Sequence, residues 1–247
     1  MTTPTLMAIL AHPDDESFPM GGTLAKAAAG GKHVHLVTAT RGEAGIANKG
    51  AVETAVLREA ELRRACIELG VQQLTFLDYM DGELETVPDS AGVARLLSLM
   101  RQSQPDVVIT FGPDGISGHL DHLVVHRWTT DAFDQYQQDQ ERPLRLYYIA
   151  PSEATQQGCG IAPPAEAVGG PVAFIDVGDF LVQKVRAAQQ HQSQNPPFKG
   201  DPETEAQEMT CHELFRLARP QFAANGHGLE TDLFATFQKH NNAQRTS

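Results

Sequence analysis

The residues best suited to chemistry form two short clusters, and each cluster follows an apolar segment. Residues 11–17 read Ala-His-Pro-Asp-Asp-Glu-Ser after the apolar run 6–10, and residues 118–122 read Gly-His-Leu-Asp-His after the apolar run 107–111. A strand that leads into a polar turn can present several side chains at the carboxyl edge of a sheet, where open α/β folds bind ligands. A solvated acidic turn is the alternative for the first cluster taken alone. Because two clusters share this arrangement, we expect them to build one site.

The residue types in these clusters favour a metal-dependent hydrolase. Imidazole and carboxylate groups are ligands of Zn²⁺, and three such ligands with an open fourth position are typical of a catalytic zinc site. Two histidines and one aspartate meet that count. Of the neighbouring residues Asp14 and Asp15, one can bind the metal while the other accepts a proton from water. Adjacent residues can divide these roles only in a turn, because in a strand they point to opposite faces, and Pro13 favours a turn.

The two motifs together resemble those of the LmbE-like (PIG-L) family of zinc-dependent N-deacetylases. The matching residues are Ala-His-Pro-Asp-Asp-Glu at 11–16 and Gly-His-x-Asp-His at 118–122, the latter after Phe-Gly-Pro-Asp-Gly at 111–115. The family includes deacetylases of N-acetylglucosaminyl-phosphatidylinositol, GlcNAc-inositol and GlcNAc-malate. The resemblance covers the order of strands and helices up to about residue 150.

This resemblance implies a role for each motif residue. It implies that one Zn²⁺ per chain is held by His12, Asp15 and His122, that Asp14 is the general base, and that His119 helps to stabilise the oxyanion. Leu120 stands where the family usually has proline, which removes a fixed φ at the start of the following helix. The placement of His119 therefore depends on the fold.

The expected reaction is removal of the acetyl group from the amide nitrogen of an N-acetylglucosamine-type substrate. An amidase that acts on a larger thiol-conjugate or antibiotic-like amide, with the same zinc site, is the alternative. A non-catalytic metal-binding protein is a third reading, and the spare carboxylate of Asp14 speaks against it. Substrate contacts are expected from Arg41, Glu43 and Arg58, although a solvated loop and an exposed helix face with i,i+4 ion pairs are the alternatives for these residues.

His126 offers a different metal-binding pair. His122 and His126 are four residues apart, so on a helix they share one face and could both bind zinc. The family resemblance instead favours His119 and His122, with His126 packed a turn deeper. The histidines outside the motifs have no partner cluster in the sequence and are interpreted as ordinary surface or strand residues; they are His33, His35, His191, His212, His227 and His240.

Composition bounds the partners. The 247 residues include 19 Lys and Arg against 31 Asp and Glu, which gives a formal net charge of −12 and argues against nucleic acid or an anionic membrane as a partner. No apolar run approaches the ~18 residues that span a bilayer, and no leader pattern opens the chain, so we expect a cytoplasmic protein. Three widely spaced cysteines offer no disulfide framework. The oligomeric state stays open, a homo-oligomer included.

The whole chain reads as alternating strands and helices. Strands are predicted at 6–10, 33–40, 74–77, 107–111, 144–149 and 172–176, and helices at 20–29, 53–69, 91–102, 123–136 and 180–192. This alternation predicts one domain over residues 1–247, a Rossmann-like three-layer α/β/α sandwich with a mostly parallel sheet. We expect its core at about 5–195, a surface excursion at 152–170, a helical and loop cover at 196–247, and a frayed end from Thr236.

Overall fold

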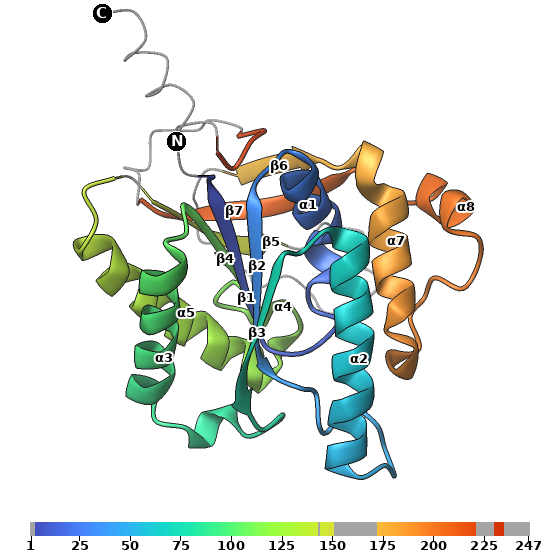
Figure 1. The fold of residues 1–247 in the computed structure, drawn as a ribbon, viewed down its shortest axis with the longest axis horizontal. Coiled ribbons are helices and arrows are strands. Elements are labelled where there is room, and N and C mark those ends of the chain that lie inside the picture. Colours follow the sequence, from blue (N-terminus) through green and yellow to red (C-terminus); the bar gives the residue numbers. More distant parts are fainter. Residues whose placement is uncertain (1–2, 143, 151–171, 221–229, 235–247) are drawn as a thin grey trace, which may run out of the picture.

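The protein is built on one seven-stranded sheet. The computed structural model describes residues 3–142, 144–150, 172–220 and 230–234 (Figure 1). The strands lie in the order β3-β2-β1-β4-β5-β7-β6. From β3 to β5 all neighbours are parallel, whereas β7 is antiparallel to β5 and to β6. The strand bounds are β1 Thr5–Leu10, β2 His33–Thr40, β3 Gln73–Tyr79, β4 Val107–Thr110, β5 Arg145–Ala150, β6 Val172–Asp176 and β7 His212–Arg219.

Helices cover both faces of this sheet. Helices α3 and α5 pack together on one side, and α1, α2 and α7 pack together on the other (Figure 1). This arrangement confirms the predicted three-layer α/β fold. The helix bounds are α1 Ser17–Ala29, α2 Ala51–Leu69, α3 Asp89–Ser103, α4 Gly115–Gly118, α5 Leu120–Gln138, α7 Leu181–Gln190 and α8 Pro202–Gln207, with short 3₁₀ turns at Leu84–Thr86, Gly178–Phe180 and Gln192–Gln194.

The strand sequences follow from this double cover. Every residue of β1 is buried, because a parallel strand between two helix layers has no face toward water, and its sequence is accordingly an apolar run. The helix layers meet closely where small residues allow it. A Cβ on Gly92 of α3 would lie 2.1 Å from the ring of Trp128 of α5, so glycine is required for the indole to pack there.

The C-terminal part of the chain differs from the prediction. Residues 196–247 were expected to be helices and loops only, but β7 inserts into the sheet between β5 and β6. Its inward residues, Glu213, Phe215 and Leu217, alternate with more exposed ones, which is the pattern of a half-buried strand. The carboxylate of Glu213 obscured that pattern. Its burial is compensated because it accepts hydrogen bonds from the backbone N–H groups of Gly22 and Thr23 and forms an ion pair with Lys184.

Other predicted elements are placed as follows. The predicted strand at 172–176 is confirmed as β6, at the edge of the sheet. The predicted excursion at 152–170 and the end from Thr236 lie outside the described residues. Among the described residues, no helix combines the length and the apolar character that crossing a membrane requires.

The order of the strands places the two sequence motifs side by side. Strand β1 pairs in parallel with β4, Leu6 beside Val107 and Ala8 beside Ile109. The segments that leave their carboxyl ends therefore emerge next to each other. In open α/β sheets this is also the point where the strand order reverses, which is where ligands bind. The first motif follows β1 and the second follows β4.

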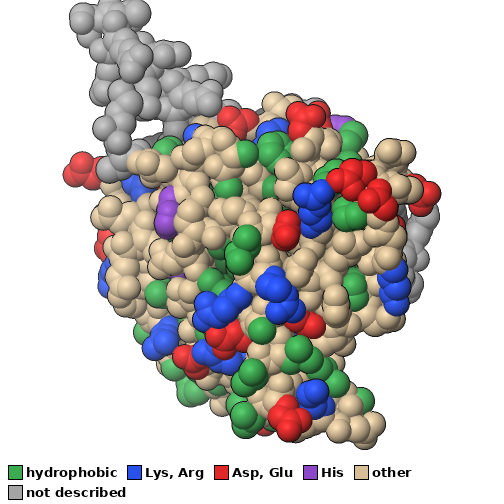
Figure 2. All heavy atoms as spheres, turned by 45° about the vertical axis from the view of Figure 1, so that its right-hand side comes forward, with side chains coloured by type: hydrophobic (Ala, Val, Ile, Leu, Met, Phe, Trp, Pro, Cys, Tyr) green, Lys and Arg blue, Asp and Glu red, His purple; other side chains and the backbone are tan. Residues whose placement is uncertain are grey.

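Charged side chains of both signs share the outer surface. On the side of the molecule where α2, α7 and α8 lie, basic and acidic side chains are interspersed (Figure 2). Two ion pairs belong to this face: Arg63 binds Glu59 within α2, and Arg186 of α7 binds Glu203 of α8, each with an N–O distance of 2.7 Å. Exposed pairs of this kind contribute about 0–1 kcal/mol each, so this face owes its stability to the apolar layer beneath it.

The buried imidazole of His35 in β2 makes stability depend on pH. Its two ring nitrogens lie 2.9 Å from the hydroxyl groups of Ser103 and Thr75, and burial lowers its pKa from 6.5 to about 4. Above pH 6.5 both folded and unfolded chains carry neutral His35. Below it the unfolded chain binds a proton that the folded chain does not, so stability falls as the pH drops from 6.5 toward 4, by at most about 3 kcal/mol.

We expect a variant without this titration to lack the corresponding slope. His35→Gln carries no ionisable group, so chemical denaturation at pH 6.5 and pH 4.5 should show a smaller loss of unfolding free energy for the variant than for the wild type. Identical losses in both proteins would show that His35 is not the group responsible.

Candidate active site

The first motif forms a tight turn directly after β1. The backbone N–H of His12 donates to Asp15 Oδ2 at 2.8 Å, and the backbone N–H of Ser17 donates to the carbonyl oxygen of Asp14 at 3.0 Å. Asp14 itself has φ 108°, a value that non-glycine residues rarely adopt. The turn therefore separates the directions of Asp14 and Asp15, as the prediction of divided roles requires.

Three side chains of the two motifs bring their ligand atoms together. His122 Nε2 lies 3.3 Å from His12 Nδ1 and 3.4 Å from Asp15 Oδ1, and His12 Nδ1 lies 3.6 Å from Asp15 Oδ2. Donor atoms on a tetrahedral zinc with bonds of about 2.0–2.1 Å are about 3.3–3.4 Å apart. Within the described part of the chain, neither His12 Nδ1 nor His122 Nε2 has a backbone hydrogen-bond partner. The donor set and its spacing thus fit a zinc ion.

The opposite nitrogen of His12 is held by two further aspartates. Its Nε2 lies 3.1 Å from Asp81 Oδ1 and 3.1 Å from Asp121 Oδ2, and Asp121 also accepts the backbone N–H groups of Gly82 and Leu84. Such carboxylates keep the proton on one imidazole nitrogen and leave the other free for a metal. Burial opposes protonation of His12, but the carboxylates of Asp121, Asp15 and Asp81 raise its pKa well above the usual value.

The sequence interpretation missed Asp81 and gave Asp121 no role. His12, Asp81 and Asp121 form one potential metal-ligand group, and His12, His119 and His122 form another. The ligand set that the resemblance implies, His12, Asp15 and His122, stays a prediction. The oxygen atoms of Asp121 already accept backbone N–H groups, and Nδ1 of His119 accepts the backbone N–H of Asp121.

His122 is oriented by the loop that precedes it. Its Nδ1 donates to the carbonyl oxygen of Gly115 at 2.9 Å, and its ring stacks on Phe111 with centroids 4.0 Å apart and an interplanar angle of 9°. Since Nδ1 carries the proton, Nε2 is the nitrogen with a free lone pair. That nitrogen faces His12 and Asp15.

His119 begins helix α5 and so has a defined tautomer. It is the N-cap residue, and its Nδ1 accepts the backbone N–H of Asp121 at 3.2 Å. Nε2 therefore carries the proton of the neutral ring. Partial burial and the nearby His12 and His122 lower the pKa of His119, which favours this neutral, donating form. Its ring lies edge-on to His12 with centroids 4.7 Å apart.

The neighbouring aspartates differ in their affinity for protons. Burial and the negative charge of Asp15 raise the pKa of Asp14 to about 7, against the opposing charge of Arg58. Burial also acts to raise the pKa of Asp15, but His122 and His12 outweigh it and hold that pKa well below its usual range. Asp15 is thus the better permanent anion, and Asp14 the better proton acceptor near neutral pH.

Known proteins with related sequences and structures were compared with this chain. The sequence model described as "PIG-L: GlcNAc-PI de-N-acetylase" matches residues 7–133. A 1D-myo-inositol 2-acetamido-2-deoxy-alpha-D-glucopyranoside deacetylase of Acidothermus cellulolyticus is 31% identical over 281 aligned residues, covering 94% of each chain. The chain belongs to the PIG-L family. It is accordingly a deacetylase, an enzyme that hydrolyses an amide.

Solved structures agree with this assignment. The N,N'-diacetylchitobiose deacetylase of Pyrococcus horikoshii is 25% identical, with a TM-score of 0.61 over 86% of this chain and 83% of that chain. A deacetylase solved in complex with teicoplanin is 17% identical, with a TM-score of 0.64 over 86% and 97%. At that identity the second likeness shows the fold alone.

Arg58 lies on helix α2, and its side chain is buried rather than exposed to solvent. Its side chain is only 4% exposed, so the alternative of a solvated helix face is wrong for this residue. Its guanidinium donates to the carbonyl oxygens of Pro13 and Gly42 and to Asp14 Oδ2. A Cβ on Gly42 or Gly45 would lie 2.2 Å from Arg58 Nη1. Gly42 and Gly45 thus make room for the guanidinium of Arg58.

Arg41 and Glu43 are engaged with the protein itself. Arg41 forms ion pairs with Glu59 and Asp78, and its guanidinium lies 4.1 Å from the ring centroid of Phe76. Glu43 accepts the backbone N–H groups of Arg41 and Asp81. Glu43 therefore links the loop after β2 to the segment that carries Asp81. Contact of Arg41 and Glu43 with a substrate stays a prediction.

His126 lies outside the cluster of ligand atoms. Its Nδ1 donates to the carbonyl oxygen of Phe111 at 2.9 Å, and its ring packs edge-on against Tyr148. Both contacts tie α5 to the sheet. The structure thus brings His122 to His12 and leaves His126 one helical turn away, next to β5.

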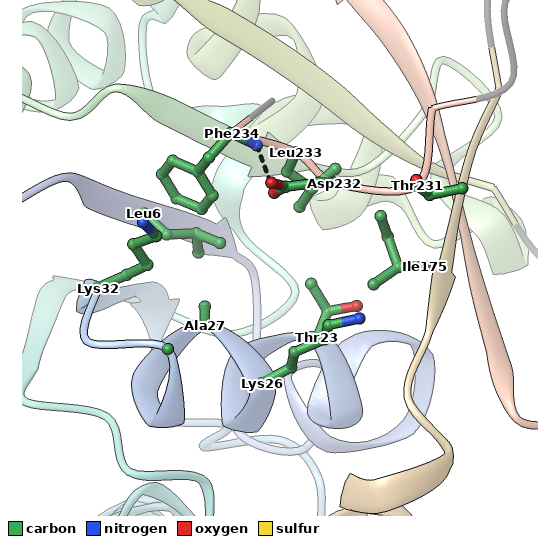
Figure 3. Close-up of a pocket in the computed structure, with 11 residues that line it drawn as sticks. Leu6, Thr23, Lys26, Ala27, Lys32, Ile175, Thr231, Asp232, Leu233 and Phe234 are labelled. Carbon is green, nitrogen blue, oxygen red and sulfur yellow. Dashed lines mark hydrogen bonds between the residues drawn. The ribbon is translucent and has the colours of Figure 1, made fainter. Parts of the chain in front are cut away.

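A separate pocket of about 240 Å³ lies at the other end of β1. Leu6 is the second residue of that strand, and the other residues that line the pocket come from α1, the turn after it, β6 and residues 231–234 (Figure 3). The ionisable side chains on its wall are Lys26, Lys32 and Asp232. Asp232 accepts the backbone N–H of Phe234, and Lys26 Nζ donates to the carbonyl oxygen of Asp176. None of the residues that line this pocket belongs to a group of metal-ligand atoms among the described residues, so the candidate active site is the one beside His12.

Proposed function

We propose that this PIG-L enzyme is zinc-dependent and removes the acetyl group from an N-acetylglucosamine-type sugar. The observation that carries the proposal is that His12 Nδ1 and His122 Nε2 lie 3.3 Å apart, with His122 Nε2 3.4 Å from Asp15 Oδ1 and His12 Nδ1 3.6 Å from Asp15 Oδ2, beside the carboxylate of Asp14. A structural zinc site closes its fourth position with protein, whereas the proposed set of three ligands with an adjacent base is typical of a catalytic site.

The residues of the chain divide the work of amide hydrolysis. Zinc, when bound to His12, Asp15 and His122, supplies Lewis acidity that lowers the pKa of water and polarises a carbonyl group. Asp14 accepts the proton of the attacking water. The Nε2–H of His119 donates to the oxyanion as negative charge develops on the carbonyl oxygen. Asp14, now protonated, returns its proton to the departing amine, so one carboxylate acts first as base and then as acid.

Relatives support an acetamido sugar as substrate. The Acidothermus cellulolyticus relative is named for an acetamido-glucopyranoside of inositol, and the Pyrococcus horikoshii enzyme for N,N'-diacetylchitobiose. Both names contain an N-acetylated sugar, and they differ in the group attached to it. We infer the shared acetamido sugar for this chain and leave the attached group to experiment.

The test measures metal content and amine release on the same preparation. We expect about one zinc ion per chain by elemental analysis, loss of activity on chelation, and its recovery on adding Zn²⁺. The probes are GlcNAc-inositol and N,N'-diacetylchitobiose, with a thiol-conjugate amide as the competitor substrate. Activity that persists without metal would overturn the zinc site. Turnover of the amide conjugate alone would replace the sugar substrate with the larger-amide alternative.

A further inference from the structure

The backbone of Asp14 needs support from its neighbours. Its φ of 108° is a conformation that persists only where surrounding contacts impose it. Arg58 donates to the carbonyl oxygen of Pro13 at 2.5 Å and to Asp14 Oδ2 at 3.3 Å. Glu16 Oε2 accepts the backbone N–H of Asp14 at 3.0 Å. The position of Asp14 therefore depends on where the Glu16 carboxylate is held.

A histidine from the far end of the chain holds that carboxylate. His191 Nε2 donates to Glu16 Oε1 at 2.7 Å, and the side chains of His191 and Glu16 are 0% and 1% exposed. The hydroxyl group of Ser17 donates to the same oxygen. His191 directly follows α7, which packs on α1 and α2. The helix layer thus fixes Glu16, and through it the N–H of Asp14.

Stability alone is a weak reason for this pair. The free-energy cost of removing a carboxylate from water offsets much of the attraction within a buried pair. The pair does fix the geometry of its two side chains. The second ring nitrogen of His191, Nδ1, is buried and has no hydrogen-bond partner among the described residues. Among the described residues, Glu16 is therefore the hydrogen-bond partner of the His191 ring.

We propose that His191 is a positioning residue for deacetylation: through Glu16 it holds the strained backbone of Asp14, and so the carboxylate that moves the proton. The inference rests on Asp14 being the base in the proposed function. The interpretation of His191 as an ordinary surface or strand histidine was wrong, because His191 is buried at the end of α7. Its partner Glu16 lies 175 positions away in the sequence.

The expected effect is on turnover rather than on metal binding. The three metal-ligand residues have supports of their own: His12 contacts Asp81 and Asp121, His122 donates to Gly115, and Asp15 accepts the N–H of His12. Losing the His191 contact displaces Asp14 and leaves these bonds in place. A displacement of about 1 Å in a reacting group can cost on the order of 10²-fold in rate.

The experiment compares two replacements of His191 in the full-length, zinc-loaded enzyme. His191→Phe keeps a ring but removes the donor, whereas His191→Gln keeps an N–H donor at the corresponding position. With the acetylated probe that the wild type turns over, we expect His191→Phe to lower kcat at least ~10-fold, with little change in KM or zinc content. His191→Gln should restore most of kcat. Glu16→Gln, which weakens the same contact, gives a second measurement if His191→Phe does not fold.

Lys184→Met is the matched control, because it breaks a buried ion pair made by α7, the helix that His191 directly follows. Lys184 Nζ lies 2.6 Å from Glu213 Oε1, and Glu213 contacts Gly22 and Thr23 rather than the Asp14 turn. We expect this variant to lose thermal stability and keep kcat. Equal losses of kcat in Lys184→Met and His191→Phe, or unchanged kcat in His191→Phe, would overturn the inference. Full activity of Asp14→Asn in the same assay would instead overturn the proposed function.

Discussion

Asp14→Asn is expected to lower kcat by about 10²–10⁴-fold, the usual cost of removing a general base, while zinc content stays at the wild-type level. Asparagine keeps the size of the side chain and can still accept a hydrogen bond from Arg58, which contacts Asp14 Oδ2 at 3.3 Å. It cannot take a proton from water. KM should change little, because the loss falls on the chemical step. Steady-state kinetics and elemental analysis of one preparation provide both measurements.

Asp15→Ala is the comparison variant for this prediction. Asp15 lies within 3.4 Å of His122 Nε2 and 3.6 Å of His12 Nδ1, so its removal takes away one of three ligands and should empty the site. Activity would then be lost because metal is lost, and excess Zn²⁺ should restore part of it in Asp15→Ala but none in Asp14→Asn. Equal loss of metal in both variants would contradict the division of roles between the two aspartates.

His119→Ala is expected to lower kcat at least ~10²-fold with zinc content unchanged, because it removes the donor that stabilises the oxyanion. His119 also caps α5, so alanine should destabilise the fold as well, by about 1 kcal/mol. His119→Asn separates the two effects. Asparagine is a good N-cap and can accept the N–H of Asp121, but it places no donor where Nε2 lies. The asparagine variant should be as stable as the wild type and as slow as the alanine variant.

His126→Ala serves as the control for the same helix. Its ring contacts are Phe111 and Tyr148, so its loss should lower stability and leave zinc and turnover close to wild type. If His126→Ala empties the site and both His119 variants remain active, then His122 and His126 are the metal pair, and the roles transferred from the family motif are wrong.

Local patterns in the sequence were sufficient for the alternation of strands and helices. Helix α2 ends at Leu69 before Gly70, as predicted, because Gly70 has φ 68° and closes the helix in the left-handed conformation. Helices α1 and α5 begin earlier than predicted, at Ser17 and Leu120. The reason is that motif residues interpreted as loop are helix starts: His119 is both the N-cap of α5 and a member of the site.

The two motifs also indicated the site itself. Each followed an apolar run, and parallel strands that are neighbours in the sheet must release their following segments at the same edge. The pairing of β1 with β4 was the step that sequence could only suggest. It brings His12 and His122 within 3.3 Å although 110 positions separate them.

The tertiary structure alone decided which charged residues outside the motifs support the site. Asp81 and His191 have no local pattern that marks them, and Arg58 was expected to contact substrate rather than Asp14. A charge can be buried only where its partners are, and those partners lie far away in the chain. Arg58 reaches Pro13 across 45 positions and His191 reaches Glu16 across 175. The sequence by itself determined the ligand types and the strands that carry them. Packing determined the protonation state of each side chain in the site and the contacts that hold the backbone of the Asp14 turn.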